Sequence, residues 1–97
     1  MPIFIKTEII KKEYLIQKDI CKKVINEHIQ WIENLKRKGI NIKSGFLVNE
    51  FKQPGDGGLL ILDIETYQDA LEIMKKDPMI KNNIVEWKLN EWIDITK

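Results

Sequence analysis

The sequence contains one cysteine, Cys21, and one histidine, His28, among its 97 residues. A single cysteine excludes an internal disulfide, and one cysteine with one histidine cannot supply the ligands of the common zinc sites. No stretch approaches the ~20 apolar residues of a membrane span, and residues 1–12 lack the apolar core of a signal peptide. We therefore expect a cytoplasmic protein with no metal site and no contact with a membrane.

A strong charge of one sign is also missing. The 16 basic and 15 acidic residues leave a formal net charge of +1, so the chain lacks the electrostatic footprint of a nucleic-acid-binding protein. The basic run Lys36, Arg37, Lys38 stands where a helix is expected to end, and cations there complement the negative end of the helix dipole. The length predicts a single domain over residues 1–97.

Hydrophobic periodicity predicts four strands and two helices. Apolar residues alternate every second position in the strands and recur at three and four positions in the helices. The predicted elements are a strand over residues 3–10, a helix over residues 20–38, a strand over residues 40–48, a strand over residues 59–64, a helix over residues 67–76 and a strand over residues 84–95.

Capping residues and glycines predict where these elements end. Asp19 is the predicted N-cap of the first helix, and Gly39 is its C-terminal stop. Thr66, followed three residues later by Asp69, resembles a capping box before the second helix. Residues 53–58 are rich in glycine and proline and are predicted to form a loop, which is not a phosphate loop because no helix follows it.

The order β-α-β-β-α-β is that of the ferredoxin-like fold, an α+β architecture with two helices on one face of a four-stranded antiparallel sheet. The other face would carry no helix, yet Leu47, either Leu59 or Ile61, and the indole of Trp92 are expected there. A solvent-exposed apolar sheet surface would tend to associate with other apolar surfaces. We therefore expect a second copy of the chain to cover it and form a homodimer.

The histidine lies inside the apolar stripe of the first helix. Residues spaced by three and four share this face, namely Cys21, Val24, Ile25, His28, Trp31, Ile32 and Leu35. His28 is therefore expected to face the core. Histidine takes and releases protons near neutral pH, so it could serve as an acid or base. Alternatively, the ring could be structural and bonded to a backbone carbonyl or a water.

A carboxylate partner would favour the catalytic interpretation. Asp77 stands after the second helix, and the fold lays both helices side by side, so His28 could approach it. Asp77 followed by Pro78 is also a good N-cap for a short turn over residues 79–82. The two roles are compatible, since a carboxylate can cap with one oxygen and orient a histidine with the other.

Ser44 and Cys21 are further candidate reactive groups. Ser44 shares a side of its strand with Ile42 and Phe46, so its hydroxyl could line a pocket near His28 or bond to the backbone. A serine nucleophile would need a base at hydrogen-bond distance. Cys21 lies two helical turns before His28, which is too far for direct activation, and is expected to pack in the core.

The three tryptophans fall into two groups. Trp31 and Trp87 lie on inward faces and are expected in the core. Trp92 falls on the open face of the sheet, where it could contact a dimer partner or line a ligand cavity.

The spacing of these residues forms a longer pattern that runs from His28 to Trp92. Its most specific part is the histidine on the first helix together with Asp77 and Pro78 after the second helix. The weaker matches are Trp31, Leu35, Gly39, Gly45, Gly57, Gly58 and Ala70. In this pattern the chain resembles the YCII-related family of small dimeric α+β barrel proteins.

The resemblance implies a ferredoxin-like protomer that dimerises through its sheets, with His28 and Asp77 as an active-site pair for proton transfer. It also implies a link to the breakdown of chlorinated or hydroxylated aromatic rings, which some members carry out. The chain departs from the family at two positions, with Ile25 where members often have an arginine and Phe46 where they often have a proline. Without the arginine, a possible anion anchor is missing.

We therefore predict a cofactor-independent acid/base enzyme of the lyase, isomerase or dehydrochlorinase type that acts on a small cyclic or aromatic-derived metabolite. His28 and Asp77 are the predicted catalytic residues, and Ser44 and Trp92 are predicted to bind the substrate. The alternative is a non-catalytic small-ligand-binding or interaction module, in which His28 and Asp77 form a structural hydrogen bond.

Overall fold

A computed structural model of the protein describes residues 1–96. The predicted elements occur in the predicted order, the short turn predicted after Asp77 is the helix α3, and a short helix, η1, is added. The elements are β1 (Ile3–Ile10), η1 (Lys12–Tyr14), α1 (Lys18–Arg37), β2 (Ile42–Val48), β3 (Pro54–Asp63), α2 (Tyr67–Met74), α3 (Pro78–Lys81) and β4 (Val85–Trp92).

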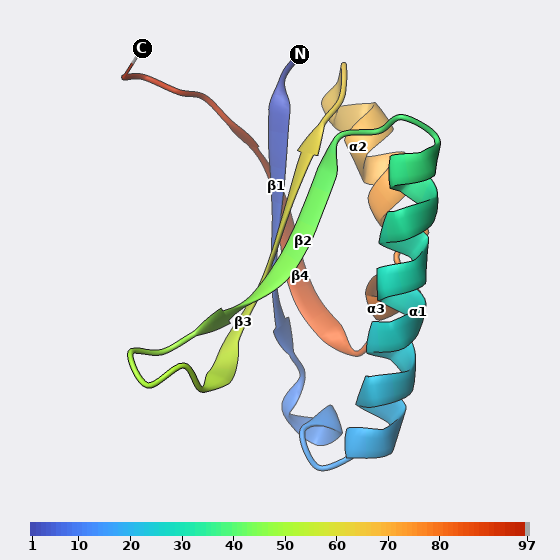
Figure 1. Cartoon of the computed structure of the whole chain (residues 1–97), viewed down its shortest axis with the longest axis vertical. Coiled ribbons are helices and arrows are strands. Elements are labelled where there is room, and N and C mark those ends of the chain that lie inside the picture. The colour runs from blue at the N-terminus through green and yellow to red at the C-terminus, as the bar shows by residue number, and fades with distance from the viewer. Residues whose placement is uncertain (97) are drawn as a thin grey trace.

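The four strands form one antiparallel sheet in the order β2-β3-β1-β4. Helices α1, α2 and α3 lie together on one side of this sheet, as Figure 1 shows. The long α1 runs along the sheet, and β3 lies between β1 and β2, which α1 connects. This arrangement is the split β-α-β of the ferredoxin-like fold, and the predicted α+β class is confirmed.

The core lies between the helices and the covered face of the sheet. On β3, Leu60 and Leu62 are 1% and 0% exposed, and on β1 Phe4 is 1% exposed. These alternate positions therefore face the helices, as the period of a strand requires. Lys6 shares the covered face of β1 and is as completely buried as Phe4. A charged side chain thus enters the interior from a central strand.

The first turn of α1 differs from the prediction. The N-cap of α1 is Gln17, and Asp19 lies inside the first turn. The predicted N-cap was therefore wrong, because an acidic residue is favoured by the helix dipole throughout the first turn as well as at the cap.

Among residues 1–96, no helix is long and apolar enough to cross a membrane.

The predicted end of α1 at Gly39 and the predicted start of α2 after Thr66 are confirmed, whereas α2 ends at Met74, two residues before its predicted end. Gly39 has a φ of +89°, and its N–H bonds the carbonyl of Lys36 while the N–H of Ile40 bonds that of Leu35, which ends α1 in a Schellman motif. At the start of α2, the Thr66 hydroxyl accepts a hydrogen bond of 3.0 Å from the backbone N–H three residues later.

Strand β3 includes most of the segment that was predicted to be a loop. It begins at Pro54, which pairs with Val48 of β2 beyond a β-bulge. The loop prediction for residues 53–58 was therefore wrong. The glycines that suggested a loop serve strand packing instead, since Gly57 has a φ of +97° and a Cβ there would collide with the carbonyl oxygen of Glu8 on β1.

Strand β4 is shorter than predicted. It ends at Trp92, although the alternation of apolar residues continues to Ile95. Its partner β1 begins its pairing at Ile3, which lies opposite Trp92. Beyond that point β4 has no neighbouring strand with which to form a ladder, so Ile93 and Ile95 do not extend it.

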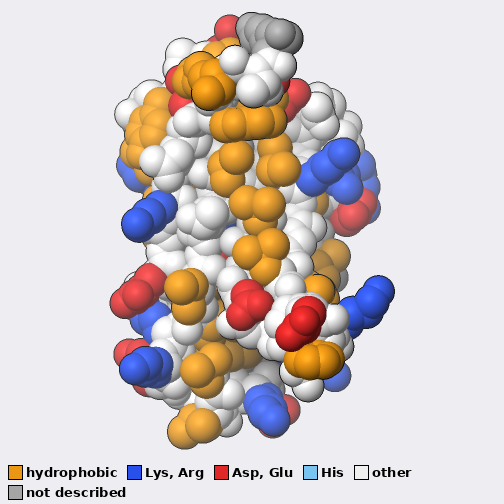
Figure 2. All heavy atoms as spheres, turned by 90° about the vertical axis from the view of Figure 1, so that its left-hand side faces the viewer, with side chains coloured by type: hydrophobic (Ala, Val, Ile, Leu, Met, Phe, Trp, Pro, Cys, Tyr) orange, Lys and Arg blue, Asp and Glu red, His pale blue; other side chains and the backbone are white. Residues whose placement is uncertain are grey.

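The uncovered face of the sheet carries hydrophobic side chains. The register places Ile5 of β1 beside Ile61 of β3, and Ile3 of β1 beside Trp92 of β4, all on this face. Figure 2 shows hydrophobic side chains gathered along the middle of this side of the molecule. Trp92 is 51% exposed, as expected for a residue that points away from the helices.

The close approach of β3 to β1 generates a prediction about Gly57. We expect Gly57→Ala to lower the free energy of unfolding by about 3 kcal/mol or more, because it adds both backbone strain and a collision with Glu8. Gly55→Ala is the matched control, since Gly55 also has a positive φ but open space around it, and should cost about 1–2 kcal/mol. Urea unfolding followed by tryptophan fluorescence measures both, and equal losses would contradict the proposed collision.

Candidate active site

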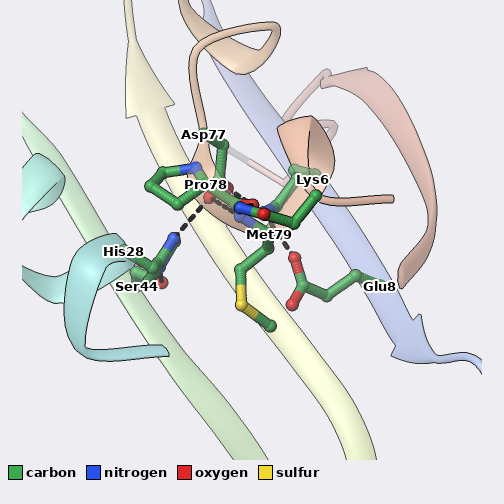
Figure 3. Close-up of polar contacts among 8 residues, drawn as sticks. Lys6, Glu8, His28, Ser44, Asp77, Pro78 and Met79 are labelled. Carbon is green, nitrogen blue, oxygen red and sulfur yellow. Dashed lines mark hydrogen bonds and ion pairs between the residues drawn. The ribbon is translucent and has the colours of Figure 1, made fainter. Parts of the chain in front are cut away.

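His28 is buried on the sheet side of α1 and makes hydrogen bonds through both ring nitrogens. Nδ1 lies 2.7 Å from Oδ1 of Asp77, and Nε2 lies 2.7 Å from Oγ of Ser44. The residue is 9% exposed. Figure 3 shows the imidazole between α1 and β2, with Ser44 on β2 and Asp77 approaching from the turn before α3. The three residues therefore form one continuous hydrogen-bonded chain.

Asp77 is fully buried and accepts hydrogen bonds from three different elements. Oδ1 accepts the bond from His28 and also one of 2.9 Å from the backbone N–H of Met79, which caps α3. Oδ2 accepts a bond of 2.6 Å from Nζ of Lys6 on β1. Capping and orientation of the histidine were expected to use different oxygens, but one oxygen does both and the other holds a lysine.

Two opposing effects act on the pKa of Asp77. Burial raises the pKa of the Asp77 carboxyl, while the hydrogen bond from His28 and the charge of Lys6 lower it. The lowering effects together are larger, so the pKa of this carboxyl lies below its ordinary value. Asp77 is therefore a carboxylate at neutral pH.

The charge of Asp77 determines how protons are arranged on His28. A carboxylate only accepts hydrogen bonds, so Nδ1 of His28 must carry a hydrogen. When the ring is neutral, Nε2 then has a free lone pair and accepts the hydrogen bond of the Ser44 hydroxyl. This is the arrangement in which a histidine can take a proton at Nε2 while the carboxylate stabilises the resulting imidazolium.

Lys6 and Glu8, which the sequence analysis did not single out, complete the polar chain. Nζ of Lys6 lies 2.6 Å from Oδ2 of Asp77 and 2.5 Å from Oε1 of Glu8. Lys6 is 1% exposed, so its charge is compensated by these two carboxylates and not by water. The sequence did contain a signal for this cluster, since Phe4, Lys6 and Glu8 stand at every second position of a strand and therefore share one face. Their burial follows only from knowing that the helices cover that face.

A cavity of about 650 Å³ opens beside the polar chain, within the size range of small-molecule sites. Its polar lining comprises Lys6, Glu8, His28 and Ser44 of the polar chain, together with Glu33 and Lys36 of α1. Its apolar walls include Ile25, Ile29 and Ile32 of α1, Phe46 of β2, Leu59 of β3 and Met79 of α3. The cavity is therefore largely apolar, with a few polar groups contributed by β1, α1 and β2.

The remaining candidate residues lie apart from this cavity. Trp92 is on the uncovered face of the sheet and does not line it, so a role in substrate binding stays a prediction. Trp31 packs against the core and lies 5.6 Å from the His28 ring, measured between centroids. Cys21 is partly buried, and its thiol donates a hydrogen bond of 3.1 Å to the carbonyl of Tyr14.

Within residues 1–96, no three His, Cys, Asp or Glu side chains are grouped so that they could hold a metal ion.

Comparison with protein families gives one match that covers most of the chain. The family model of the YCII-related domain matches residues 6–93. This span extends over β1 through the end of β4 and includes Lys6, Glu8, His28, Ser44 and Asp77. No curated protein matches the sequence significantly.

Among the solved structures that share the fold, two illustrate the range of similarity. The first is 5-chloro-2-hydroxyhydroquinone dehydrochlorinase (TftG) from Burkholderia phenoliruptrix AC1100 in complex with 2,5-dihydroxybenzoquinone, with a TM-score of 0.73 and 18% identity. The match covers 94% of this chain and 93% of that one. The second is the de novo designed protein Ferredog-Diesel, with a TM-score of 0.60 and 8% identity, over 93% of this chain and 84% of that one. At these identities the similarity establishes the fold.

The buried Asp77 generates a prediction about acid stability. Its lowered pKa means that the folded protein binds this proton less readily than the unfolded chain, so the stabilisation is present at neutral pH and lost as the pH falls below about 4. We expect Asp77→Asn to cost about 3 kcal/mol at pH 7, since Asn preserves the cap but removes the charge that faces Lys6.

The difference between the wild type and Asp77→Asn should shrink when urea unfolding is repeated at about pH 3.5. Asp56→Asn is the matched control, because Asp56 is exposed on β3 and makes none of these contacts. A difference for Asp77→Asn that is the same at both pH values would show that its charge does not stabilise the fold.

Proposed function

The chain belongs to the YCII-related family, and on this premise we propose that it is a cofactor-independent acid/base enzyme acting on a small cyclic or aromatic-derived metabolite. The observation that carries the proposal is the hydrogen-bonded chain from Asp77 through His28 to Ser44, which reaches the wall of an apolar cavity. A buried pair that only stabilised the fold would not need a ring nitrogen directed to such a cavity.

In the proposed reaction, His28 is the group that moves the proton. Asp77 holds Nδ1–H, so the lone pair on Nε2 can accept a proton from a C–H or O–H group of the substrate. In an elimination, the electrons of that bond form a new double bond and the leaving group departs with its own bonding pair. The Asp77 carboxylate stabilises the imidazolium of His28 that forms. The imidazolium then gives its proton to the leaving group or to water, which regenerates the neutral base.

The cavity walls support an uncharged ring as the substrate. Ile25 lines the cavity where relatives often carry an arginine, so this part of the α1 wall is apolar, and the charged residues Glu33 and Lys36 line the cavity further along the same helix. The structurally similar dehydrochlorinase binds 2,5-dihydroxybenzoquinone, a small oxygenated ring. We therefore place hydroxylated and chlorinated aromatic rings first among the substrate classes to test.

We also propose that two copies of the chain associate through the uncovered face of the sheet. Ile3, Ile5, Ile61 and Trp92 form an apolar surface there, and surfaces of this kind on a single chain are commonly covered by a partner. A two-fold dimer is the simplest assembly, because it covers the same patch on both chains.

The first functional prediction concerns His28. We expect the wild type to turn over at least one compound in a screen of hydroxylated and chlorinated aromatic rings, and His28→Gln to lose at least about 10³-fold in kcat/KM through loss of the acid/base group. Ser44→Ala should lose only about tenfold, since it removes one hydrogen bond to the base.

Two outcomes would contradict this prediction. Turnover that survives in His28→Gln would exclude the proposed base. A loss in Ser44→Ala as large as that in His28→Gln would instead indicate nucleophilic catalysis by Ser44, for which the Asp77–His28–Ser44 order is also suited. Binding without turnover in the wild type would favour the non-catalytic module.

The dimer proposal has its own test. Light scattering after size exclusion should give twice the chain mass for the wild type, and Ile61→Glu should shift the protein to the monomer by burying a charge in the interface. Gln30→Glu is the matched control, because Gln30 is exposed on α1. A wild type that is monomeric, or a dimer that tolerates Ile61→Glu, would contradict the proposed interface.

A further inference from the structure

Glu8 is a second carboxylate that lines the cavity. It lies two positions after Lys6 on the covered face of β1, and its side chain is 11% exposed. Figure 3 shows Glu8 at the opposite end of the polar chain from His28, with the Met79 side chain between them. The proton-transfer chemistry described above makes no use of Glu8, although it faces the same cavity.

The carboxylate of Glu8 has unused capacity to accept hydrogen bonds. Oε1 is buried and in ionic contact with Nζ of Lys6 at 2.5 Å, so its charge is already compensated from the protein side. Oε2 accepts no hydrogen bond from residues 1–96 and is not among the buried atoms. A ligand hydroxyl or amine in the cavity could therefore donate to Oε2.

Strand β3 leaves room for Glu8 at this position. A Cβ added at Gly58 would lie 3.1 Å from Cγ of Glu8, so the Glu8 side chain would have to shift by a few tenths of an ångström. Gly58 itself lines the cavity, as does Gly57. Gly58 therefore leaves room for the Glu8 side chain at the cavity surface, while Gly57 allows β3 to approach the backbone of β1.

The charges around Glu8 determine which ligands this part of the cavity can accept. Among residues 1–96, Lys6 is the cation in ionic contact with Glu8, and it is shared with Asp77, while Glu33 and Lys36 of α1 add one charge of each sign to the cavity lining. One ammonium group therefore faces two carboxylates, so a negative charge remains uncompensated when His28 is neutral. An anionic group placed here would meet that charge in a poorly solvated site, whereas a neutral or cationic donor would be attracted.

We propose that Glu8 is the specificity-determining residue of the cavity. It accepts a hydrogen bond from a hydroxyl or amino group on a small ring, and it excludes rings that carry a carboxylate. This proposal rests on the proposed function only in assigning the substrate to this cavity. It adds that the substrate must present a hydrogen-bond donor to β1 while its reacting atom faces His28.

Binding of two matched probes tests the proposal without requiring turnover. The probes are hydroquinone, which has two hydroxyl donors, and benzoate, which carries a carboxylate on the same ring. Kd values at pH 7 are measured by NMR titration of the full chain, without oxygen to keep hydroquinone reduced. We expect the wild type to prefer hydroquinone by about tenfold or more, and Glu8→Gln to reduce that preference by about tenfold.

Two further variants make the result specific to Glu8. Glu27→Gln makes the same change at an exposed position on α1 and should leave the preference as in the wild type. Glu8→Asp keeps the charge but withdraws the carboxylate by one methylene, so it should weaken hydroquinone binding without strengthening benzoate binding. If Glu8→Gln does not fold, Glu8→Asp provides the test, because unchanged hydroquinone binding in Glu8→Asp would overturn the proposal.

The proposal is also overturned if the wild type binds benzoate as tightly as hydroquinone or binds neither, or if Glu8→Gln retains the wild-type preference. These results are distinct from failure of the proposed function. A chain that turns over no compound but whose preference depends on Glu8 is a selective binding protein. A chain whose turnover depends on His28 but whose preference ignores Glu8 is an enzyme with a different specificity residue.

Discussion

The buried carboxylate of Asp77 is the group on which the rest of this architecture depends. It accepts hydrogen bonds from His28 on α1, Lys6 on β1 and the backbone N–H of Met79 at the start of α3. A charge in a position with 0% exposure is tolerated only when donors from the protein replace water. The same three bonds therefore hold a strand and two helices together and fix the orientation of the histidine.

The way in which Lys6 compensates the charge of Asp77 determines the chemistry of the cavity. Lys6 neutralises Asp77 from the side opposite to His28, so the carboxylate remains charged and able to accept the Nδ1 hydrogen. Lys6 also contacts Glu8, which extends the polar chain along β1 to a second point on the cavity wall. Nε2 of His28 and the Glu8 carboxylate are thus two ends of one electrostatic network. We expect a change of charge at either end to alter the other through Lys6.

Much of the fold was predictable because periodicity reports which side of each element is buried. The α+β class, the order of the elements, the core position of His28 and the capping role of Asp77 all follow from local patterns and capping rules. The errors have local causes as well. Acidic residues favour several positions at a helix start, which misplaced the cap at Asp19, and the glycines at 57 and 58 serve the approach of β3 to Glu8 and not a loop.

The residue types that could do chemistry, and the elements that carry them, follow from local patterns in the sequence, since histidine, aspartate and capping signals are local properties of the chain. Which of these residues meet follows from tertiary packing. The bond between His28 and Asp77 spans 49 residues and that between Lys6 and Asp77 spans 71. The burial of Lys6 is likewise a property of the sheet face that the helices cover. Such contacts depend on how helices and strands pack, and no local pattern records them.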